Sequence, residues 1–382
     1  MRVVWITHNY PRFVGDVAGG FLHPLAVALR QLGVDVRVVA PSDAGQGGEA
    51  PLEGVPIRRV RYGTAADERL AYQGTMLGAL KSPRGAFAFN RLRRALRAGA
   101  EAELEGAGTA AVVHAHWWVP SGLAAPIGAP MVLTCHGTDV RLLDRFPVTA
   151  WLARPTFRRA QVVTTVSNAL AEIVHRRVGV HVADDAIQPM PVAVIERPLT
   201  EGSGGVVVIG RLTTQKRVQL AIEALAITAQ RGRSLTLTIV GDGPARPALE
   251  ARVSQLGLAA SVHFAGAVRP DQVPRFLATA SCCVMPATGE GFGLAAAEAL
   301  MQGVPVVACV DGGGLGDVVP SSGAGRVVAP QADAIASAVL ELIDDPEARE
   351  SARVAGMRWR ESLSPDAVAQ RCLTWYQRAL YA

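Results

Sequence analysis

The sequence predicts an α/β protein made of two doubly wound domains, each built on a parallel sheet. Short β-branched runs alternate with longer amphipathic segments along the whole chain of 382 residues, which is the pattern of strand–helix–strand units. A stretch rich in proline and glycine, residues 190–205, interrupts the alternation, which then restarts. A chain of this length with 49% hydrophobic residues can bury two separate cores.

The first domain is expected to open with a strand–helix–strand unit. Residues 1–10 have the composition of a buried strand, residues 21–33 form a helical pattern that ends at a glycine, and residues 34–41 resemble a second strand. Three further apolar runs are expected to be strands of the same sheet, namely residues 110–116, 129–137 and 160–167. This order predicts a single doubly wound parallel sheet.

The second domain repeats this alternation after the linker. The strands are expected at residues 204–212, 234–244, 261–268, 281–287 and 304–313, and two of the helices at residues 218–232 and 245–257. Another helix is expected to begin near Gly293 and to end at Gly303. The order predicts a second Rossmann-like sheet.

A long amphipathic helix is expected at the C-terminus. Ser364 is a suitable N-cap, Pro365 suits the first helical position, and an apolar stripe recurs at helical spacing through Val368, Cys372 and Trp375. The expected parts of the chain are residues 1–196, residues 197–364 and a last helix, residues 365–382, which crosses back to the first domain.

Composition limits the classes of partner. The net charge is +5, but aromatic residues make up only 5% and no basic run is interleaved with them, so a nucleic acid is a poor candidate. Anionic small molecules or an acidic membrane surface fit better. The five scattered cysteines suggest neither a disulfide framework nor a zinc site, and no signal peptide or membrane-spanning run is visible, so a cytoplasmic location is expected.

Two carboxylates flank a glycine-rich segment in the second domain. Glu290 is expected in a strand-to-helix loop and Glu298 in the helix that follows. Gly291 and Gly293 leave backbone N–H groups uncovered at the start of that helix, where anions are favoured. A carboxylate also suits a vicinal diol such as that of ribose. The alternative is an ordinary loop acid and an ordinary exposed helix glutamate.

The loop after the first strand of this domain carries two cations, Arg211 and Lys216. The chain has only two lysines among its 38 basic residues, so a compact ammonium at residue 216 suggests a specific use, such as clamping a diphosphate. The alternative is a solvated helix N-terminus. Gly241 lies in a tight turn that suits any strand-to-helix junction, and Gly266 and Val268 leave backbone exposed where a planar base could lie.

Polar residues also gather at strand ends of the first domain. His114 and His116 end one expected strand, and His136 and Asp139 follow the next. A single histidine in such a place is usually structural, whereas several facing one crevice suggest a site. They lack a metal-binding spacing and are therefore interpreted as hydrogen-bonding groups. The glycine-bearing loop after the first strand either approaches a phosphate or a sugar, or is simply flexible.

In this order, the motifs resemble those of glycosyltransferase family 4, the retaining nucleotide-sugar transferases of the GT-B fold. The likeness rests on GRLTTQK, VGDGPARPALE and EGFGLAAAEAL, preceded by HGTD and the glycine-bearing loop, and it spans nearly the whole chain. The resemblance implies two Rossmann-like domains that face a central cleft. It also implies a nucleoside diphosphate sugar as the donor.

The resemblance further assigns roles to residues of the second domain. Arg211 and Lys216 would bind the donor diphosphate, and Glu298 the two ribose hydroxyls. Glu290 would hold the transferred sugar together with three backbone amides, those of Gly291, Phe292 and Gly293. The implied donor-binding set also contains Gly210, Gly241, Gly266, Val268 and Leu294.

In the first domain, the resemblance implies that His136 approaches the sugar, that Gly19 and Gly20 form a phosphate-side loop, and that His116 and Asp139 lie on the acceptor side. The implied catalytic residues are His136, Arg211, Lys216 and Glu290. One departure is Asp317, which stands where the family often has a glutamate, and no catalytic role is expected for it.

The implied reaction is a same-face displacement without a metal or other cofactor, since the two cations would stabilise the departing diphosphate. The acceptor would be a glycan, a lipid-linked molecule or a small molecule. Two alternatives remain at this point, a GT-B nucleotide-sugar epimerase and a non-catalytic binding protein for a sugar or a nucleotide.

A basic segment of the first domain raises the question of a membrane. Residues 84–97 gather five arginines beside Phe89, Leu92 and Leu96, as in a helix that lies on an anionic membrane. The alternative, which the arginine-rich composition favours, is a helix that packs its apolar side on the sheet and leaves its charges in water.

Overall fold

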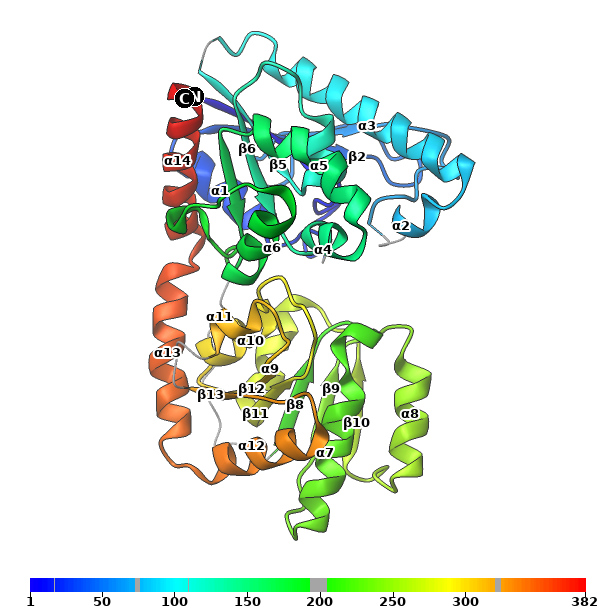
Figure 1. The fold of residues 1–382 in the computed structure, drawn as a ribbon, viewed down its shortest axis with the longest axis vertical. Coiled ribbons are helices and arrows are strands. Elements are labelled where there is room, and N and C mark those ends of the chain that lie inside the picture. Colours follow the sequence, from blue (N-terminus) through cyan, green and yellow to red (C-terminus); the bar gives the residue numbers. More distant parts are fainter. Residues whose placement is uncertain (17, 73–75, 109, 193–204, 320–323) are drawn as a thin grey trace. The chain divides into compact units, whose positions relative to one another are not determined.

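The structure, a computed structural model, describes residues 1–382 except 17, 73–75, 109, 193–204 and 320–323 (Figure 1). The chain forms two compact units, and each contains one sheet. Unit 1 comprises Met1–Pro191 and Ser364–Ala382, and unit 2 comprises Val192–Leu363. Most of the linker expected at residues 190–205 lies outside the described residues.

Unit 1 is built on a seven-stranded sheet with the order β3-β4-β2-β1-β5-β6-β7. Neighbouring strands pair in parallel except for the short β3. The strands are β1 (Arg2–Ile6), β2 (Asp35–Pro41), β3 (Gly48–Glu49), β4 (Ile57–Val60), β5 (Ala111–His116), β6 (Met131–Cys135) and β7 (Val162–Thr165). The five strands expected from apolar runs are thus confirmed, because a parallel sheet covered on both faces needs strands that are apolar throughout.

The helices of unit 1 differ in how they begin, and only some of them have a side-chain cap. They are α1 (Leu22–Gln31), α2 (Met76–Ala79), α3 (Pro83–Leu104), α4 (Thr138–Arg145), α5 (Pro147–Arg159), α6 (Asn168–Val178) and α14 (Pro365–Tyr381). Shorter helical turns are η1 (Trp118–Gly122) and η2 (Asp184–Ala186). Both α3 and α14 have a serine N-cap followed directly by proline.

The C-terminal helix α14 is part of the core of unit 1. It lies against α1, as Figure 1 shows for the red and blue helices. Its Trp375 and Tyr376 are fully buried, and the Tyr376 hydroxyl accepts a hydrogen bond from the Trp5 indole of β1 at 3.1 Å. The expected apolar stripe of this helix therefore covers the sheet.

Unit 2 is built on a parallel six-stranded sheet with the order β10-β9-β8-β11-β12-β13. The strands are β8 (Gly205–Ile209), β9 (Leu237–Val240), β10 (Val262–Gly266), β11 (Ala280–Met285), β12 (Val306–Cys309) and β13 (Gly325–Val328). The helices are α7 (Val218–Gln230), α8 (Arg246–Gln255), α9 (Val273–Thr279), α10 (Leu294–Met301), α11 (Leu315–Val318), α12 (Ala332–Asp344) and α13 (Ala348–Ser362), with the turns η3 (Thr214–Lys216) and η4 (Pro270–Gln272). The helix expected to open near Gly293 is α10.

Both sheets are doubly wound, because the strand order reverses direction once in each. The reversal falls between β1 and β5 in unit 1 and between β8 and β11 in unit 2. The loops at the carboxyl ends of two such strands diverge and leave a crevice, which is where open α/β sheets bind ligands. None of the described helices is both long enough and apolar enough to cross a membrane.

Candidate functional site

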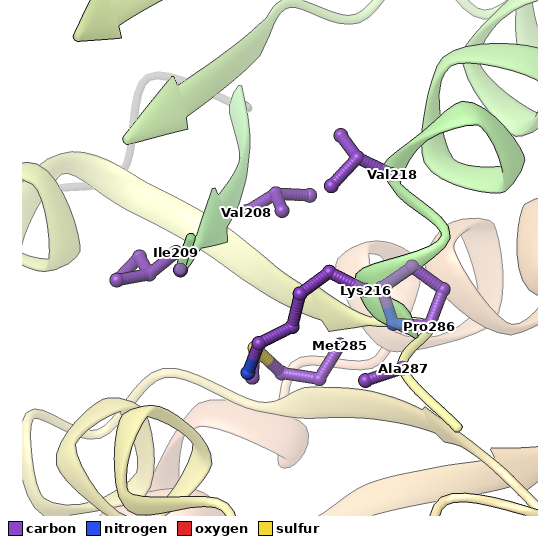
Figure 2. A pocket seen from close by; sticks show the side chains of 8 residues that line it. Val208, Ile209, Lys216, Val218, Met285, Pro286 and Ala287 are labelled. Atoms are coloured by element: carbon purple, nitrogen blue, oxygen red, sulfur yellow. The ribbon is translucent and has the colours of Figure 1, made fainter. Parts of the chain in front are cut away.

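A pocket lies at the reversal point of the unit 2 sheet, between the carboxyl ends of β8 and β11. Its lining comes from the last residues of β8 with Gly210, from Met285 to Ala287 at the end of β11, and from the start of α7, and Lys216 runs across it (Figure 2). About 210 Å³ of this space, which opens to solvent, is free of atoms.

The Lys216 side chain is held over the chain at the end of β8. The turn η3 and the left-handed backbone of Arg217 (φ 47°) bring it back toward Gly210, where a Cβ atom would lie 3.3 Å from Lys216 Cε. Lys216 Nζ forms an ion pair with Glu290 Oε1 at 2.8 Å, and the two side chains are 22% and 15% exposed. The structure thus joins two residues that the sequence separates by 74 positions.

Glu290 is fixed by the backbone around it as well as by Lys216. Its N–H donates to the Gly312 carbonyl at 2.9 Å, and its own carbonyl accepts from the Gly314 N–H at 3.0 Å. The Gln215 amide donates to Glu290 Oε1 at 3.2 Å. The loop after β11 therefore runs alongside the loop after β12.

A glycine cluster after β12 makes this close approach possible. A Cβ atom on Gly314 would lie 2.2 Å from the Gly291 carbonyl oxygen, and one on Gly313 would lie 2.7 Å from that of Glu290. No side chain fits at these distances. The glycines at residues 312–314 thus position Glu290, while Asp317 lies beyond them in α11.

Arg217 is a positioning residue that the sequence reasoning missed. Its guanidinium donates to both carboxylate oxygens of Asp311, at 2.6 and 2.8 Å, and to the Pro286 carbonyl at 2.8 Å. The hydrogen bonds to Arg217 lower the pKa of Asp311. Arg217 ties together three loops around the pocket. In the sequence it follows Lys216 directly and is indistinguishable from a solvated cation.

The start of α10 presents free backbone N–H groups beside this loop. Gly293 precedes the helix with φ 100°, and its Cβ position would lie 2.4 Å from Leu315, so a glycine is required there. Phe292 and Leu294, on either side of Gly293, were both expected to bind the donor. Leu294 is partly exposed, whereas the Phe292 ring is buried against Trp359 with 5.7 Å between ring centroids.

Glu298 lies in the second turn of α10 and is partly buried. Desolvation raises its pKa to about 7. Among the described residues no cation pairs with it. The Glu298 carboxylate lies close enough to Cys283 of β11 to raise the pKa of that thiol, although burial raises it more. Glu298 is therefore a carboxyl group near the end of β11 with unused acceptor capacity.

Arg211 is exposed and has no ion pair within the described part of unit 2. Gly241, in contrast, is needed for packing, since a Cβ atom there would lie 2.0 Å from the Gly210 carbonyl oxygen. The Gly241 N–H donates to the Gly266 carbonyl at 2.8 Å, so the loops after β8, β9 and β10 are joined side by side. Val268, just beyond, is partly buried.

The reversal point of the unit 1 sheet holds a histidine cluster, in which His116 is buried and His8 and His136 are partly buried. His116 Nδ1 lies 3.1 Å from His136 Nε2, and the His136 ring packs on Trp117 with 4.2 Å between ring centroids. Burial lowers the pKa of His116 and of His136 well below the usual value, and that of His8 to about 4. These imidazoles are neutral at physiological pH, and His116 Nε2 has no partner among the described atoms.

His114 has a structural role. Its Nδ1 lies 2.8 Å from the Tyr376 hydroxyl and its Nε2 lies 2.7 Å from Thr134 Oγ1, so both ring nitrogens are satisfied inside the core. Burial also lowers its pKa, to about 3. His114 therefore links the sheet to α14.

Asp139 is 2% exposed, and its carboxylate is occupied by the backbone. It accepts hydrogen bonds from the N–H groups of His136, Gly137 and Trp118 at 3.0 to 3.2 Å. Burial nevertheless raises its pKa. This carboxylate fixes the backbone on either side of His136 and leaves little room for a ligand.

The glycine loop after β1 is tightly packed at one of its expected residues. Gly19 has φ 67°, and a Cβ atom there would lie 2.1 Å from the Asn9 carbonyl oxygen. Gly20 follows it, partly exposed, just before α1. The described residues contain no group of three or more histidine, cysteine or acidic side chains arranged to hold a metal ion.

Two family profiles match the chain, one in each half. The family described as "Glycosyltransferase Family 4" matches residues 19–192, and that described as "Glycosyl transferases group 1" matches residues 196–359. Together the two matches span most of both units.

Individual proteins show the same likeness. The chain is 29% identical to a 2-deoxystreptamine glucosyltransferase of Streptomyces kanamyceticus over 279 residues, which are 66% of this chain and 72% of that protein. It is also 29% identical to a glycogen synthase of Mycobacterium tuberculosis over 97% of this chain and 92% of that protein. A solved sucrose-phosphate synthase from Thermosynechococcus elongatus shares the fold, with a TM-score of 0.78 at 20% identity over 100% of this chain and 99% of that one.

Proposed function

Since this chain is a glycosyltransferase of family 4 with the GT-B fold, we propose that it transfers a hexose-type sugar from a nucleoside diphosphate sugar to a hydroxyl group of an acceptor, with retention of configuration. The proposed acceptors are a glycan, a lipid-linked molecule or a small molecule. One relative is named for 2-deoxystreptamine and another for glycogen, so neither small nor polymeric acceptors are favoured. The expected cytoplasmic location remains a prediction.

The observation that carries this proposal is the ion pair between Glu290 and Lys216, the lysine that lines the pocket at the reversal point of the unit 2 sheet. An ammonium has three donors, so Lys216 can keep Glu290 and still bind a phosphate oxygen. Glu290 keeps acceptor capacity for sugar hydroxyls. One cation and one carboxylate in contact thus suit the point where a sugar joins a diphosphate.

The groups around this pair suit the rest of a nucleotide sugar. Arg211 is exposed and unpaired within the described residues, so it is available for the diphosphate. The N–H groups at the start of α10, around Gly293, favour negative charge. Glu298 has the two acceptor oxygens that a ribose diol requires.

The chemistry follows from the charge that develops on the donor. When the bond between the anomeric carbon and the phosphate oxygen breaks, the electron pair goes to the diphosphate, and Arg211 and Lys216 stabilise that charge. The acceptor oxygen forms the new bond on the same face, and its proton passes to the departing phosphate. We propose that these cations replace a divalent metal ion.

In unit 1, we propose that His136 contacts the transferred sugar as a neutral hydrogen-bonding group. Its low pKa and its fixed ring support this role. Gly19 and Gly20 are proposed for the phosphate side of the donor, and His116 for support of His136 on the acceptor side. Asp139 is proposed only to hold the backbone of that loop.

The test is donor binding and turnover by Lys216→Ala beside the wild-type enzyme. Loss of the Lys216 charge is expected to lower turnover about 10²- to 10³-fold, because that preorganised charge stabilises the leaving group in the transition state. The matched control is Arg233→Ala, which removes an exposed cation paired with Asp344 elsewhere in unit 2 and should leave activity unchanged. Wild-type turnover in Lys216→Ala would refute the proposed site, and the anomeric configuration of the product, read by NMR, tests retention.

A further inference from the structure

Helix α5 is apolar on two opposite faces. Its inner face packs in unit 1 through Ala150, Ala153, Thr156 and Phe157. Its outer face carries Val148, Trp151, Leu152 and Pro155 at helical spacing, and we call these four residues the α5 stripe. Val148, Trp151 and Leu152 are 64%, 68% and 52% exposed. The outer face of a surface helix is normally polar, so this stripe requires an explanation.

Positive charge surrounds the α5 stripe. Arg145 lies over the exposed Phe146 ring at 5.3 Å, directly before the helix, and Arg154 and Arg158 are exposed beside the stripe. The helix contains no acidic residue, and these three arginines have no ion pair within the described residues. The nearest acid in the sequence, Asp144, is already paired with two arginines of α6.

The basic helix α3, for which the sequence left a membrane contact open but favoured packing on the sheet, has a different surface. Its Leu92 and Leu96 are fully buried, as in a helix packed on the sheet. Arg84 is paired with Asp67 at 2.6 Å, and Arg97 donates to carbonyl groups just after η1. Of its large apolar residues, Phe87 is the exposed one. The apolar side of α3 is therefore used inside unit 1, whereas the α5 stripe is not.

We propose that the α5 stripe docks this protein on an anionic lipid bilayer, with Trp151 and Leu152 in the interfacial region and Arg154 and Arg158 on lipid phosphates. Tryptophan and arginine beside aliphatic residues are the composition of helices that lie in a membrane interface. A second copy of this chain fits less well, because stripe-to-stripe contact would bring the arginines of both copies together without an acid between them. The interaction requires no donor and is separate from the transfer chemistry.

The test is co-sedimentation of the full-length protein with vesicles of phosphatidylcholine, with and without phosphatidylglycerol. We expect binding to the anionic vesicles that weakens at high salt. A Trp151→Ser/Leu152→Ser variant should bind at least about tenfold more weakly, because it removes the groups that enter the interface. An Arg154→Gln/Arg158→Gln variant should bind anionic vesicles more weakly, by about fivefold for each arginine removed.

Two matched variants serve as controls. Tyr381→Ser removes a large side chain that is 88% exposed at the end of α14, and Phe87→Ser removes the exposed phenylalanine of α3. Both variants should bind vesicles like the wild type. Urea unfolding of each variant shows whether it is folded, and the arginine variant provides a second test if the serine variant unfolds. The proposal is overturned if the wild type does not bind anionic vesicles, or if Phe87→Ser weakens binding and the Trp151→Ser/Leu152→Ser variant does not. It is also overturned if the stripe variants change only self-association, measured by sedimentation velocity.

Discussion

Glu290 and Glu298 lie in one segment of unit 2, yet their surroundings differ. Glu290 is paired with a lysine, whereas Glu298 has no cationic partner among the described residues and loses solvation. Desolvation disfavours the charged form of a carboxyl group, so Glu298 titrates near neutrality in the ligand-free protein. Two acids in one site with different environments commonly have different roles.

The raised pKa of Glu298 predicts that donor affinity depends on pH. Glu298 is protonated below its pKa of about 7 and accepts hydrogen bonds best as a carboxylate, so affinity should rise as the pH rises through about 7. The measurement is calorimetric titration with an intact nucleotide sugar, whose phosphodiester groups stay ionised in this range. Glu298→Gln should bind more weakly with no such pH dependence. An unchanged profile in this variant would contradict the assignment. The histidine proposed to contact the sugar does not interfere, since burial keeps the pKa of His136 well below this range.

Removal of divalent metal ions is predicted to leave turnover unchanged. If Arg211 and Lys216 stabilise the diphosphate, the enzyme should work in a chelating buffer at its full rate. The measurement is release of nucleoside diphosphate with EDTA, with and without added Mg²⁺. A loss of activity that Mg²⁺ restores would show that the two cations are insufficient.

At the scale of elements, the site of unit 2 depends on how closely its loops approach one another. Hydrogen bonds join the loops after β8, β9 and β10, and the loop after β11 is joined to the loop after β12. Glycines make both contacts possible, as Gly241 does against Gly210 and Gly314 does against Gly291. These glycines allow the close packing of the loops that surround the pocket.

Gly241→Ala is therefore predicted to destabilise unit 2 strongly. The new Cβ atom would meet a backbone oxygen at 2.0 Å, and the residue has φ 135°, so strain and overpacking add to at least about 3 kcal/mol in the free energy of unfolding. The matched control is Gly232→Ala, where φ is 80° but nothing lies within 4 Å, with an expected loss of about 1 kcal/mol. Urea unfolding measures both, and equal losses would show that the loop relaxes.

At the scale of the whole molecule, the two units differ in how the chain builds them. Unit 2 is one continuous segment, whereas unit 1 needs the C-terminal helix α14 to complete its core. Trp375 is fully buried in unit 1, and the Tyr376 hydroxyl bonds both Trp5 and His114. Without α14 these polar groups and the adjoining face of α1 would lose their partners.

The fragments are predicted to behave differently. Residues 192–363 should unfold cooperatively on their own, whereas residues 1–191 should not, because a buried face and several hydrogen bonds would be missing. The measurement is circular dichroism during urea unfolding. Adding back residues 364–382, joined to residues 1–191 by a flexible linker, should restore the transition. Cooperative unfolding of residues 1–191 alone would contradict this account of α14.

Most strands could be predicted because a buried strand has an apolar local sequence, but β4 was missed. Its sequence, IRRV, contains two arginines and does not resemble a buried strand. One of them, Arg58, is paired with Glu103 of α3 at 2.6 Å. That partner lies 45 positions away, so the pair that allows an arginine in this sheet is invisible locally. The strands β3 and β13 were also not predicted, nor were the helices α2, α5, α9, α11, α12 and α13.

The sequence by itself determined two doubly wound domains, the family and a short set of candidate residues, because apolar periodicity and glycine motifs are local signals. The tertiary structure decided which of those residues meet. It paired Lys216 with Glu290, left Glu298 without a cation among the described residues, brought the Trp118 N–H to the Asp139 carboxylate, and exposed the α5 stripe. Such outcomes depend on distances between segments far apart in the chain, and only folding sets those distances.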